Sequence, residues 1–121
     1  MAPPKPSLRP ARLTVVLAQW CPHCVPLSAK YARRLAHRLR IPLRILDIDR
    51  KAQVREADRL VRRFGDPAPD YLIPQVFLEW SDGSAQHLLT GFSEQVARTQ
   101  QAWDDLLASE WLKQTRAGSG A

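Results

Sequence analysis

The spacing of apolar residues changes several times along the chain, and each change predicts a new secondary-structure element. Residues 12–18 are apolar and β-branched on both faces, which is typical of a strand inside a sheet. Apolar residues at helical spacing follow over 25–39 and again over 49–64. Residues 43–48 lie between these helices and predict a second strand. The chain is therefore expected to begin strand, helix, strand, helix.

The second half of the chain predicts a hairpin and a last helix. Residues 75–80 alternate between apolar and polar, and Ser81-Asp-Gly-Ser84 is a strong hairpin turn signal, so residues 85–89 should return antiparallel. Ser93 is a suitable N-cap for the helix that follows. The complete order is βαβαββα, and its opening strand, helix and strand favour a right-handed crossover with parallel pairing.

The sequence also indicates where each predicted helix begins or ends and which of its residues face the core. Pro22 suits a first helical turn, whereas the ring of Pro26 meets the carbonyl of Pro22 and should bend that turn. Asp49 is the expected N-cap of the second helix and Gly65 its stop. The residues expected to face the core are Val25, Ala29, Ala32, Leu35, Ala36 and Leu39, then Ala57, Leu60, Val61 and Phe64, and finally Val96, Trp103, Leu107 and Trp111.

The length of 121 residues fits one domain, with about a hundred residues for the fold itself. Residues 1–11, rich in proline and basic side chains, predict a flexible arm, residues 12–113 the folded domain, and residues 114–121 a flexible tail. The sequence shows neither a recognisable secretory leader nor an apolar run long enough for a membrane helix. We therefore expect a cytoplasmic protein that does not bind membranes.

The formal net charge of +6 is unevenly distributed. Residues 1–65 carry 15 Lys or Arg and 4 Asp or Glu, while residues 66–121 carry 3 and 8. A basic segment can bind nucleic acid, but here the basic residues recur at helical spacing without interleaved aromatic residues or a glycine-rich loop. A solvated helix face explains this pattern, so we expect no nucleic-acid binding. The remaining consequence is a preference for acidic partner proteins.

The two cysteines, Cys21 and Cys24, are too few for a disulfide scaffold and lie where the first strand gives way to the first helix. Cysteines three residues apart in a first helical turn can reach disulfide distance, and the N–H groups and dipole there stabilise a thiolate. Such positions lower a thiol pKa to roughly 3.5 to 7.5. Cys21 is therefore the expected attacking thiol. Cys24, facing the core, is the expected buried and protonated resolving thiol.

The residues beside the cysteines each have two interpretations. An imidazolium of His23 between the two sulfurs would favour the thiolate and hence the reduced protein. Alternatively, His23 is an exposed residue at the helix start with no role. Trp20, directly before Cys21, would shield the thiolate and touch a substrate, or it would serve only in packing.

The motif Trp20-Cys-x-x-Cys after a buried strand, with Ile73-Pro74 before a strand hairpin and Gly91 before the last helix, resembles the thioredoxin superfamily. The resemblance covers about residues 12–112. It implies an α/β fold of the minimal thioredoxin type, with a four-stranded mixed sheet of strand order 2-1-3-4 flanked by three helices, similar in size to glutaredoxins. It also implies that Pro74 is a cis-proline opposite the dithiol, that the Ile73 backbone pairs with an extended substrate peptide, and that Gly91 lines the substrate groove. An ordinary turn glycine is an equal explanation of Gly91.

The chain departs from the family pattern near the dithiol. The dipeptide Pro22-His23 matches bacterial periplasmic disulfide oxidases and differs from the Gly-Pro of typical thioredoxins. Val15 stands where thioredoxins have a buried aspartate that takes part in proton transfer, and Asp47 and Asp49 are the candidate substitutes. The dipeptide favours an oxidising protein, whereas a cytoplasmic location favours a reducing one. The direction of net electron flow therefore stays open.

We therefore predict a protein-disulfide oxidoreductase whose catalytic residues are Cys21, Pro22, His23 and Cys24. Its redox-active disulfide, Cys21–Cys24, requires no further cofactor and no metal. Its expected partners are protein disulfides or dithiols and a thiol or reductase as electron donor. We expect the protein to be a monomer.

Two other functions are compatible with the same residues. A glutaredoxin-like protein would bind glutathione or bridge an iron–sulfur cluster between subunits. A zinc site is disfavoured because only His23, His37 and His87 could join the cysteines, and they are dispersed along the chain. A noncatalytic adaptor would bind a partner near Pro74 while the cysteines form a static disulfide.

Overall fold

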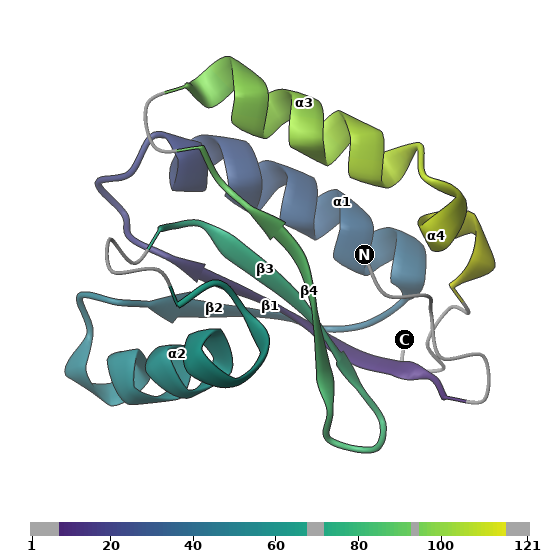
Figure 1. Cartoon of the computed structure of the whole chain (residues 1–121), viewed down its shortest axis with the longest axis horizontal. Helices are drawn as coiled ribbons and strands as arrows, with labels where there is room; N and C mark the ends of the chain where they lie inside the picture. The colour runs from purple at the N-terminus through teal and green to yellow at the C-terminus, as the bar shows by residue number, and fades with distance from the viewer. Residues whose placement is uncertain (1–7, 68–71, 93–94, 116–121) are drawn as a thin grey trace.

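The computed structural model describes residues 8–67, 72–92 and 95–115 (Figure 1). Its strands are β1 (Pro10–Leu17), β2 (Leu43–Asp47), β3 (Gln75–Trp80) and β4 (Ala85–Thr90). Its helices are α1 (Ala29–Leu39), α2 (Lys51–Phe64), α3 (Val96–Leu107) and the short α4 (Glu110–Gln114), and an irregular helical segment, η1 (His23–Ser28), precedes α1.

The four strands form one mixed sheet in the order β2-β1-β3-β4, which confirms the predicted fold class and strand order. The strands β1 and β2 are parallel, with Leu13 opposite Leu43 and Leu17 opposite Asp47. The strand β3 runs antiparallel to both of its neighbours, β1 and β4. The layout is that of a minimal thioredoxin-like fold. It brings the carboxyl end of β1 and the start of β3 to one edge of the sheet.

Helices cover both faces of the sheet, with α1 and α3 on one side and α2 on the other (Figure 1). Alternation along β1 divides its side chains between two cores, because successive residues of a strand point to opposite faces. Leu13, Val15 and Leu17 pack in the larger core with α1 and α3. Val16 packs in the smaller core beneath α2. Both cysteines belong to the larger core.

The predicted helix over 25–39 is wrong at its start. Val25 has extended backbone angles (φ −132°, ψ 125°), and the regular helix α1 begins only at Ala29. The bend expected at Pro26 is thus a full interruption, because a proline disfavours helical geometry in the residue before it. Val25 is accordingly only half-buried. The other five residues predicted to face the core from this helix are buried, and Tyr31 joins them.

The last predicted helix is divided into α3 and α4. Ser93, its expected cap, lies outside the described residues, and Gln95 precedes the first helical residue. Trp103 and Trp111 are buried as predicted, but Val96 is exposed. The inner side of α3 is formed instead by Thr99, Trp103 and Leu106. The polar residue Thr99 therefore faces the core from the first turn of α3, where the apolar pattern had predicted Val96.

Other boundaries differ by one or two residues. The helix α2 begins at Lys51 after Arg50, so Asp49 is not its N-cap. The strand β1 begins at Pro10, inside the segment expected to be a flexible arm. The turn at 81–84 closes the β3–β4 hairpin as predicted, with Gly83 at φ +87°. Within the described residues, no helix is both long and apolar enough to cross a membrane.

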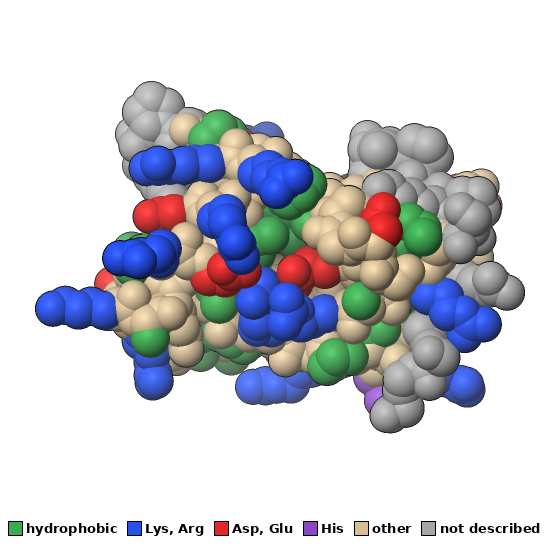
Figure 2. All heavy atoms as spheres, turned by 90° about the horizontal axis from the view of Figure 1, so that it is seen from below, with side chains coloured by type: hydrophobic (Ala, Val, Ile, Leu, Met, Phe, Trp, Pro, Cys, Tyr) green, Lys and Arg blue, Asp and Glu red, His purple; other side chains and the backbone are tan. Residues whose placement is uncertain are grey.

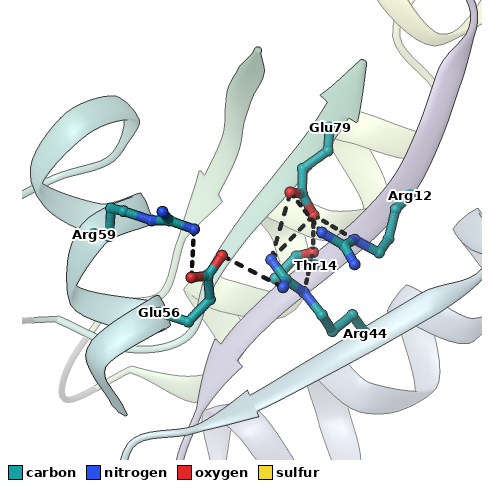
Figure 3. A network of polar contacts seen from close by, with 6 residues as sticks. All are labelled: Arg12, Thr14, Arg44, Glu56, Arg59 and Glu79. Carbon is teal, nitrogen blue, oxygen red and sulfur yellow. Dashed lines mark hydrogen bonds and ion pairs between the residues drawn. The ribbon is translucent and has the colours of Figure 1, made fainter. Parts of the chain in front are cut away.

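A network of polar side chains lies on the α2 side of the sheet (Figure 3). Glu79 on β3 accepts from Arg12 Nε at 2.8 Å and Nη2 at 3.0 Å, and from the hydroxyl of Thr14. Arg44 on β2 lies 3.3 Å from Glu79 Oε2 and 3.5 Å from Glu56 on α2. Burial alone would raise the pKa of Glu79, but the hydrogen bonds from Arg12 and Thr14 and the charge of Arg44 lower it below its ordinary value. The network thus links three strands to α2.

Candidate active site

The two cysteines lie in a tight turn that follows β1. The Cys21 N–H donates to the carbonyl of Ala18 at 3.2 Å, which starts the turn. The Cys21 carbonyl then accepts from the N–H groups of both Cys24 and Val25 at 3.0 Å each. These bonds fold the chain back on itself between Cys21 and Cys24. The turn therefore holds the two side chains close together without a disulfide between them.

The two thiols are unequal. Both side chains are buried, Cys21 with 5% of its surface exposed and Cys24 with none. Burial raises the pKa of the Cys24 thiol well above its ordinary value, and a hydrogen bond with the Cys21 side chain and the negative charge of Asp47 raise it further. Cys24 is thus a buried thiol that keeps its proton at neutral pH. This is the state expected from the sequence for a resolving cysteine.

The helix dipole expected to stabilise a thiolate at Cys21 is much reduced. The regular helix α1 starts at Ala29, and the intervening segment contains the extended residue Val25. The effect of a helix dipole falls off within a turn of the helix end. The N–H groups of Cys24 and Val25 are also already bonded to the Cys21 carbonyl.

His23 is buried, with 4% of its surface exposed, so its interpretation as an exposed residue at a helix start is wrong. Its Nδ1 atom lies 2.8 Å from the hydroxyl oxygen of Thr99 on α3. The Nδ1 atom of the ring is therefore bonded to α3. Pro22, the other residue between the cysteines, precedes η1 with helical angles (φ −67°, ψ −25°).

Ile73, Pro74 and Gly91 meet at the same edge of the sheet as the cysteines. The Ile73–Pro74 peptide bond is cis. Gln75, the next residue, pairs with Val16 near the end of β1, so Pro74 lies beside the segment that leads to Cys21. The Gly91 N–H donates to the Pro74 carbonyl at 2.8 Å.

The position of Gly91 leaves no room for a side chain. A Cβ atom on Gly91 would lie 2.4 Å from Pro74 Cδ and 3.1 Å from the Ile73 carbonyl oxygen. Real Cβ atoms do not approach other heavy atoms this closely, so a side chain would displace the Ile73–Pro74 segment. Gly91, which follows β4, therefore allows the chain to pass close to Pro74.

Trp20 is the most exposed of the large apolar residues that the structure describes, at 69%. Its Nε1–H donates to Asp49 Oδ2 at 2.8 Å, which fixes the ring from the β2–α2 connection. Such exposure is incompatible with a packing role alone. An exposed and oriented indole directly before Cys21 is a suitable contact surface for a substrate.

The two candidate substitutes for the absent buried aspartate, Asp47 and Asp49, have different surroundings in the structure. Asp47 is buried at the end of β2, and its charge contributes to the raised pKa of Cys24. The Asp49 carboxylate instead binds Trp20. Of the two, Asp47 is thus the carboxylate whose charge acts on the Cys24 thiol.

A cavity of about 480 Å³ opens beside Gly91. Its lining carries both charges and hydrogen-bonding groups: Asp66, Leu72, His87, Thr90, Gly91, Phe92, Gln95 and Arg98. His87 is half-buried there, and its burial lowers its pKa. The cavity therefore offers opposite charges, from Asp66 and Arg98, to a small polar ligand.

Thr99 is the residue of this region that the sequence analysis missed. It is completely buried and joins His23 to the chain after β4, because its oxygen also accepts from the Phe92 N–H at 2.9 Å. Thr99 lies one helical turn before the buried Trp103, and this spacing could have indicated that it faces the core.

Comparison of the chain with protein-family models, with curated proteins and with solved structures finds no match. Within the described residues, no three His, Cys, Asp or Glu side chains cluster in a way that could hold a metal ion.

Proposed function

We propose that the protein is a thiol–disulfide oxidoreductase that exchanges disulfides with protein substrates through Cys21 and Cys24, as members of the thioredoxin superfamily do. The observation that carries this proposal is the turn after β1, in which the Cys21 carbonyl accepts from the N–H groups of both Cys24 and Val25 and two buried cysteines three residues apart are brought together. Two such sulfurs can form a disulfide with little movement of the backbone, because the turn already holds them together. The unequal environments of the two thiols give them different roles.

In the first step the Cys21 thiolate attacks one sulfur of a substrate disulfide. A bond forms between the Cys21 sulfur and that sulfur, and the substrate's own S–S bond breaks. The second substrate sulfur leaves as a thiolate and takes up a proton.

In the second step Cys24 attacks the Cys21 sulfur as a thiolate, and the proton that it loses is taken up by the departing substrate sulfur. The mixed disulfide breaks, the substrate leaves as a dithiol, and the Cys21–Cys24 disulfide remains, so two electrons have passed to the substrate. An external thiol or reductase then returns two electrons to the protein. The same steps in reverse oxidise a substrate dithiol.

Substrate would bind along the edge of the sheet that carries the cis peptide bond. The exposed ring of Trp20 flanks Cys21 on one side. The Ile73–Pro74 segment, whose Pro74 carbonyl accepts from the Gly91 N–H, would offer backbone groups to an extended peptide.

The decisive experiment compares two single variants. Cys24→Ser should accumulate mixed disulfides with protein substrates, because Cys21 can still attack but nothing resolves the product. Cys21→Ser should accumulate none, because the remaining thiol is fully buried and protonated. Non-reducing gels show the mixed disulfides of each variant. The rate of insulin reduction by dithiothreitol measures its exchange activity. Full exchange activity in both variants, or none in the parent protein, would refute the proposal.

The cavity beside Gly91 favours a second candidate, exchange with glutathione. Glutathione carries carboxylates and an ammonium group, which match Arg98 and Asp66 in charge. The Cys24→Ser variant distinguishes the two candidates. If glutathione is the physiological partner, glutathione disulfide converts Cys21 to a single mixed disulfide within seconds while protein disulfides react far more slowly.

A further inference from the structure

One wall of the cavity beside Gly91 is held by a single buried side chain, that of Gln75. Gln75 follows the cis Ile73–Pro74 peptide bond and has no exposed surface. Its Oε1 accepts from the Asp66 N–H at 2.9 Å, and its Nε2 donates to the carbonyls of Asp66 and Leu72, also at 2.9 Å. Three hydrogen bonds from one amide therefore hold Asp66 and Leu72, which both line the cavity.

The buried amide of Gln75 has a fixed position. Each of its polar atoms has a hydrogen-bond partner, as a polar group without access to solvent requires. The chain also makes room for it at Gly65, where a Cβ atom would lie 2.5 Å from Gln75 Oε1 and 2.6 Å from Phe77 Cζ. A close-packed interior of this kind allows little displacement. The backbone at Asp66 is therefore fixed relative to β3.

The carboxylate of Asp66 differs from the other titratable groups of the cavity. Gln75 binds backbone groups of Asp66, so this attachment does not use the half-buried carboxylate. None of the ion pairs between described residues includes Asp66 or Arg98. Arg98 is exposed, and its guanidinium carbon lies 4.4 Å from the centre of the Phe92 ring. Burial lowers the pKa of His87, so its ring is neutral at pH 7.

The cavity adjoins the segment that would bind substrate. Leu72 directly precedes Ile73, and the Gly91 N–H donates to the Pro74 carbonyl at 2.8 Å. Ile73 itself packs against the core cluster that contains both cysteines. A peptide bound along this segment, with its disulfide at Cys21, can therefore extend a neighbouring side chain into the cavity.

We propose that the cavity beside Gly91 is a recognition subsite in which Asp66, positioned by Gln75, binds a positively charged group next to the substrate disulfide. This inference rests on the proposed exchange function. Ammonium and guanidinium groups donate hydrogen bonds to a carboxylate, and such charge-assisted bonds are stronger than neutral ones. The preference concerns the group beside the disulfide and not the net charge of a substrate protein. Gln75 is a positioning residue, because it acts through Asp66.

Two small disulfides of nearly the same shape test the subsite. Cystamine carries an ammonium group at each end, whereas the disulfide of mercaptoethanol carries a hydroxyl group there. Quenched mass spectrometry gives the rate constant at which each compound oxidises the reduced protein. Asp66→Asn removes the charge but keeps the backbone bonds to Gln75, so the ratio of the cystamine rate constant to the neutral one should fall about fivefold.

The matched control is Asp105→Asn, which makes the same change in net charge on the exposed side of α3. It should keep the parent ratio. A parent ratio in Asp66→Asn as well, or an equal fall in both variants, would overturn the proposal, because the carboxylate in the cavity would then have no specific effect.

The variant Gln75→Met tests the positioning role, because methionine has a similar length and no amide. The ratio should fall as in Asp66→Asn, and the double variant should show no further fall, since both substitutions remove the same interaction. A parent ratio in Gln75→Met, or falls that multiply in the double variant, would mean that Gln75 is only structural. Should Gln75→Met fail to fold, hydrogen exchange in the unmodified protein decides. The side-chain amide protons of Gln75 should exchange slowly, and exchange as fast as in an exposed amide would refute its role.

A ligand that cannot exchange separates the subsite from the proposed function. S-Methylcysteamine is a cationic thioether without a disulfide, and its hydroxyl analogue is neutral. The cation should cause saturable shifts of the Leu72 and Gly91 amide signals in the unmodified protein, and Asp66→Asn should abolish them. If these shifts occur in a protein that exchanges no disulfides, the proposed function fails and the subsite holds. If exchange is intact but the cation causes no such shifts, the subsite is wrong and the function holds.

Discussion

The raised pKa of Cys24 makes the free energy of unfolding depend on pH. Its thiol has a raised pKa in the folded protein, chiefly because it is buried, and an ordinary pKa of about 9 when the chain unfolds. Above pH 9 the unfolded chain therefore releases a proton that the folded chain retains, so the free energy of unfolding falls as the pH rises. Below pH 9 both states keep the proton and the stabilisation is complete.

The reduced protein should accordingly lose about 1 kcal/mol of unfolding free energy per pH unit above pH 9 through this residue. Denaturant titrations at pH 8, 9 and 10 measure the effect. The variant Cys24→Ala should show a smaller slope over the same interval, and so should the oxidised protein, which has no titrating thiol. Identical slopes for all three forms would mean that Cys24 keeps an ordinary pKa in the fold.

Single residues also show where the sequence was sufficient and where it was not. The proximity of Cys21 and Cys24 was predictable, because two residues three positions apart lie close together in a single turn of the chain. The contact between His23 and Thr99 was not, because it joins residues 76 positions apart and a threonine gives no apolar signal on a helix. Local chemistry was therefore readable from the sequence, and the partner from α3 was not.

At the scale of elements, Glu79 joins β1, β2 and β3 through Arg12, Thr14 and Arg44 (Figure 3). Its lowered pKa means that it contributes stability above the ordinary carboxyl range and loses that contribution as the pH falls. The variant Glu79→Gln should lower the free energy of unfolding by about 1 to 3 kcal/mol at pH 7, because it removes the carboxylate that pairs with Arg12 and one of the two carboxylates that pair with Arg44.

The matched control for this substitution is Glu110→Gln. Glu110 is exposed and pairs with Lys113 across the surface of α4 at 3.3 Å, so its loss should cost less than about 0.5 kcal/mol. Urea titrations of both variants at pH 7 and pH 3 provide the comparison. The difference between Glu79→Gln and the parent protein should shrink at pH 3. A difference that is unchanged there would exclude the ionised carboxylate as its source.

The elements themselves were largely predictable because each has a clear apolar period. Alternation indicated β3 and the turn residues indicated the hairpin, and both were right. The first helix was predicted to start too early, because its apolar residues continue at helical spacing through Val25 while Pro26 interrupts the backbone. The side-chain pattern predicts a helix there, but Pro26 prevents helical geometry at Val25, so the regular helix begins only at Ala29.

At the scale of the whole molecule, basic side chains cover much of the face beneath the sheet (Figure 2). The arginines Arg55, Arg59, Arg62 and Arg63 of α2 line a shallow hollow of about 540 Å³ on this side, together with Asp58. The helix α2 begins close to Asp49, which binds Trp20 beside Cys21. We therefore expect this face to steer acidic protein substrates toward the dithiol.

The prediction is tested by two double variants with the same change in net charge at the two ends of α2. Lys51→Glu with Arg55→Glu lies near Trp20, and Arg62→Glu with Arg63→Glu lies at the far end, on the order of 10 Å further along the helix. This separation exceeds the Debye length of about 8 Å at physiological salt, so the near pair should act more strongly on the dithiol. Exchange with an acidic protein disulfide should slow roughly fivefold in the near variant, and less in the far one.

Rates measured by stopped-flow tryptophan fluorescence at low and at 0.5 M salt separate steering from other effects. High salt should remove the difference between the near variant and the parent protein, because screening shortens the reach of surface charges while leaving the buried dithiol unchanged. A basic protein disulfide should show the opposite preference. Equal rates for acidic and basic disulfides at low salt would contradict a role for α2, and the uneven charge of the chain would then serve solubility alone.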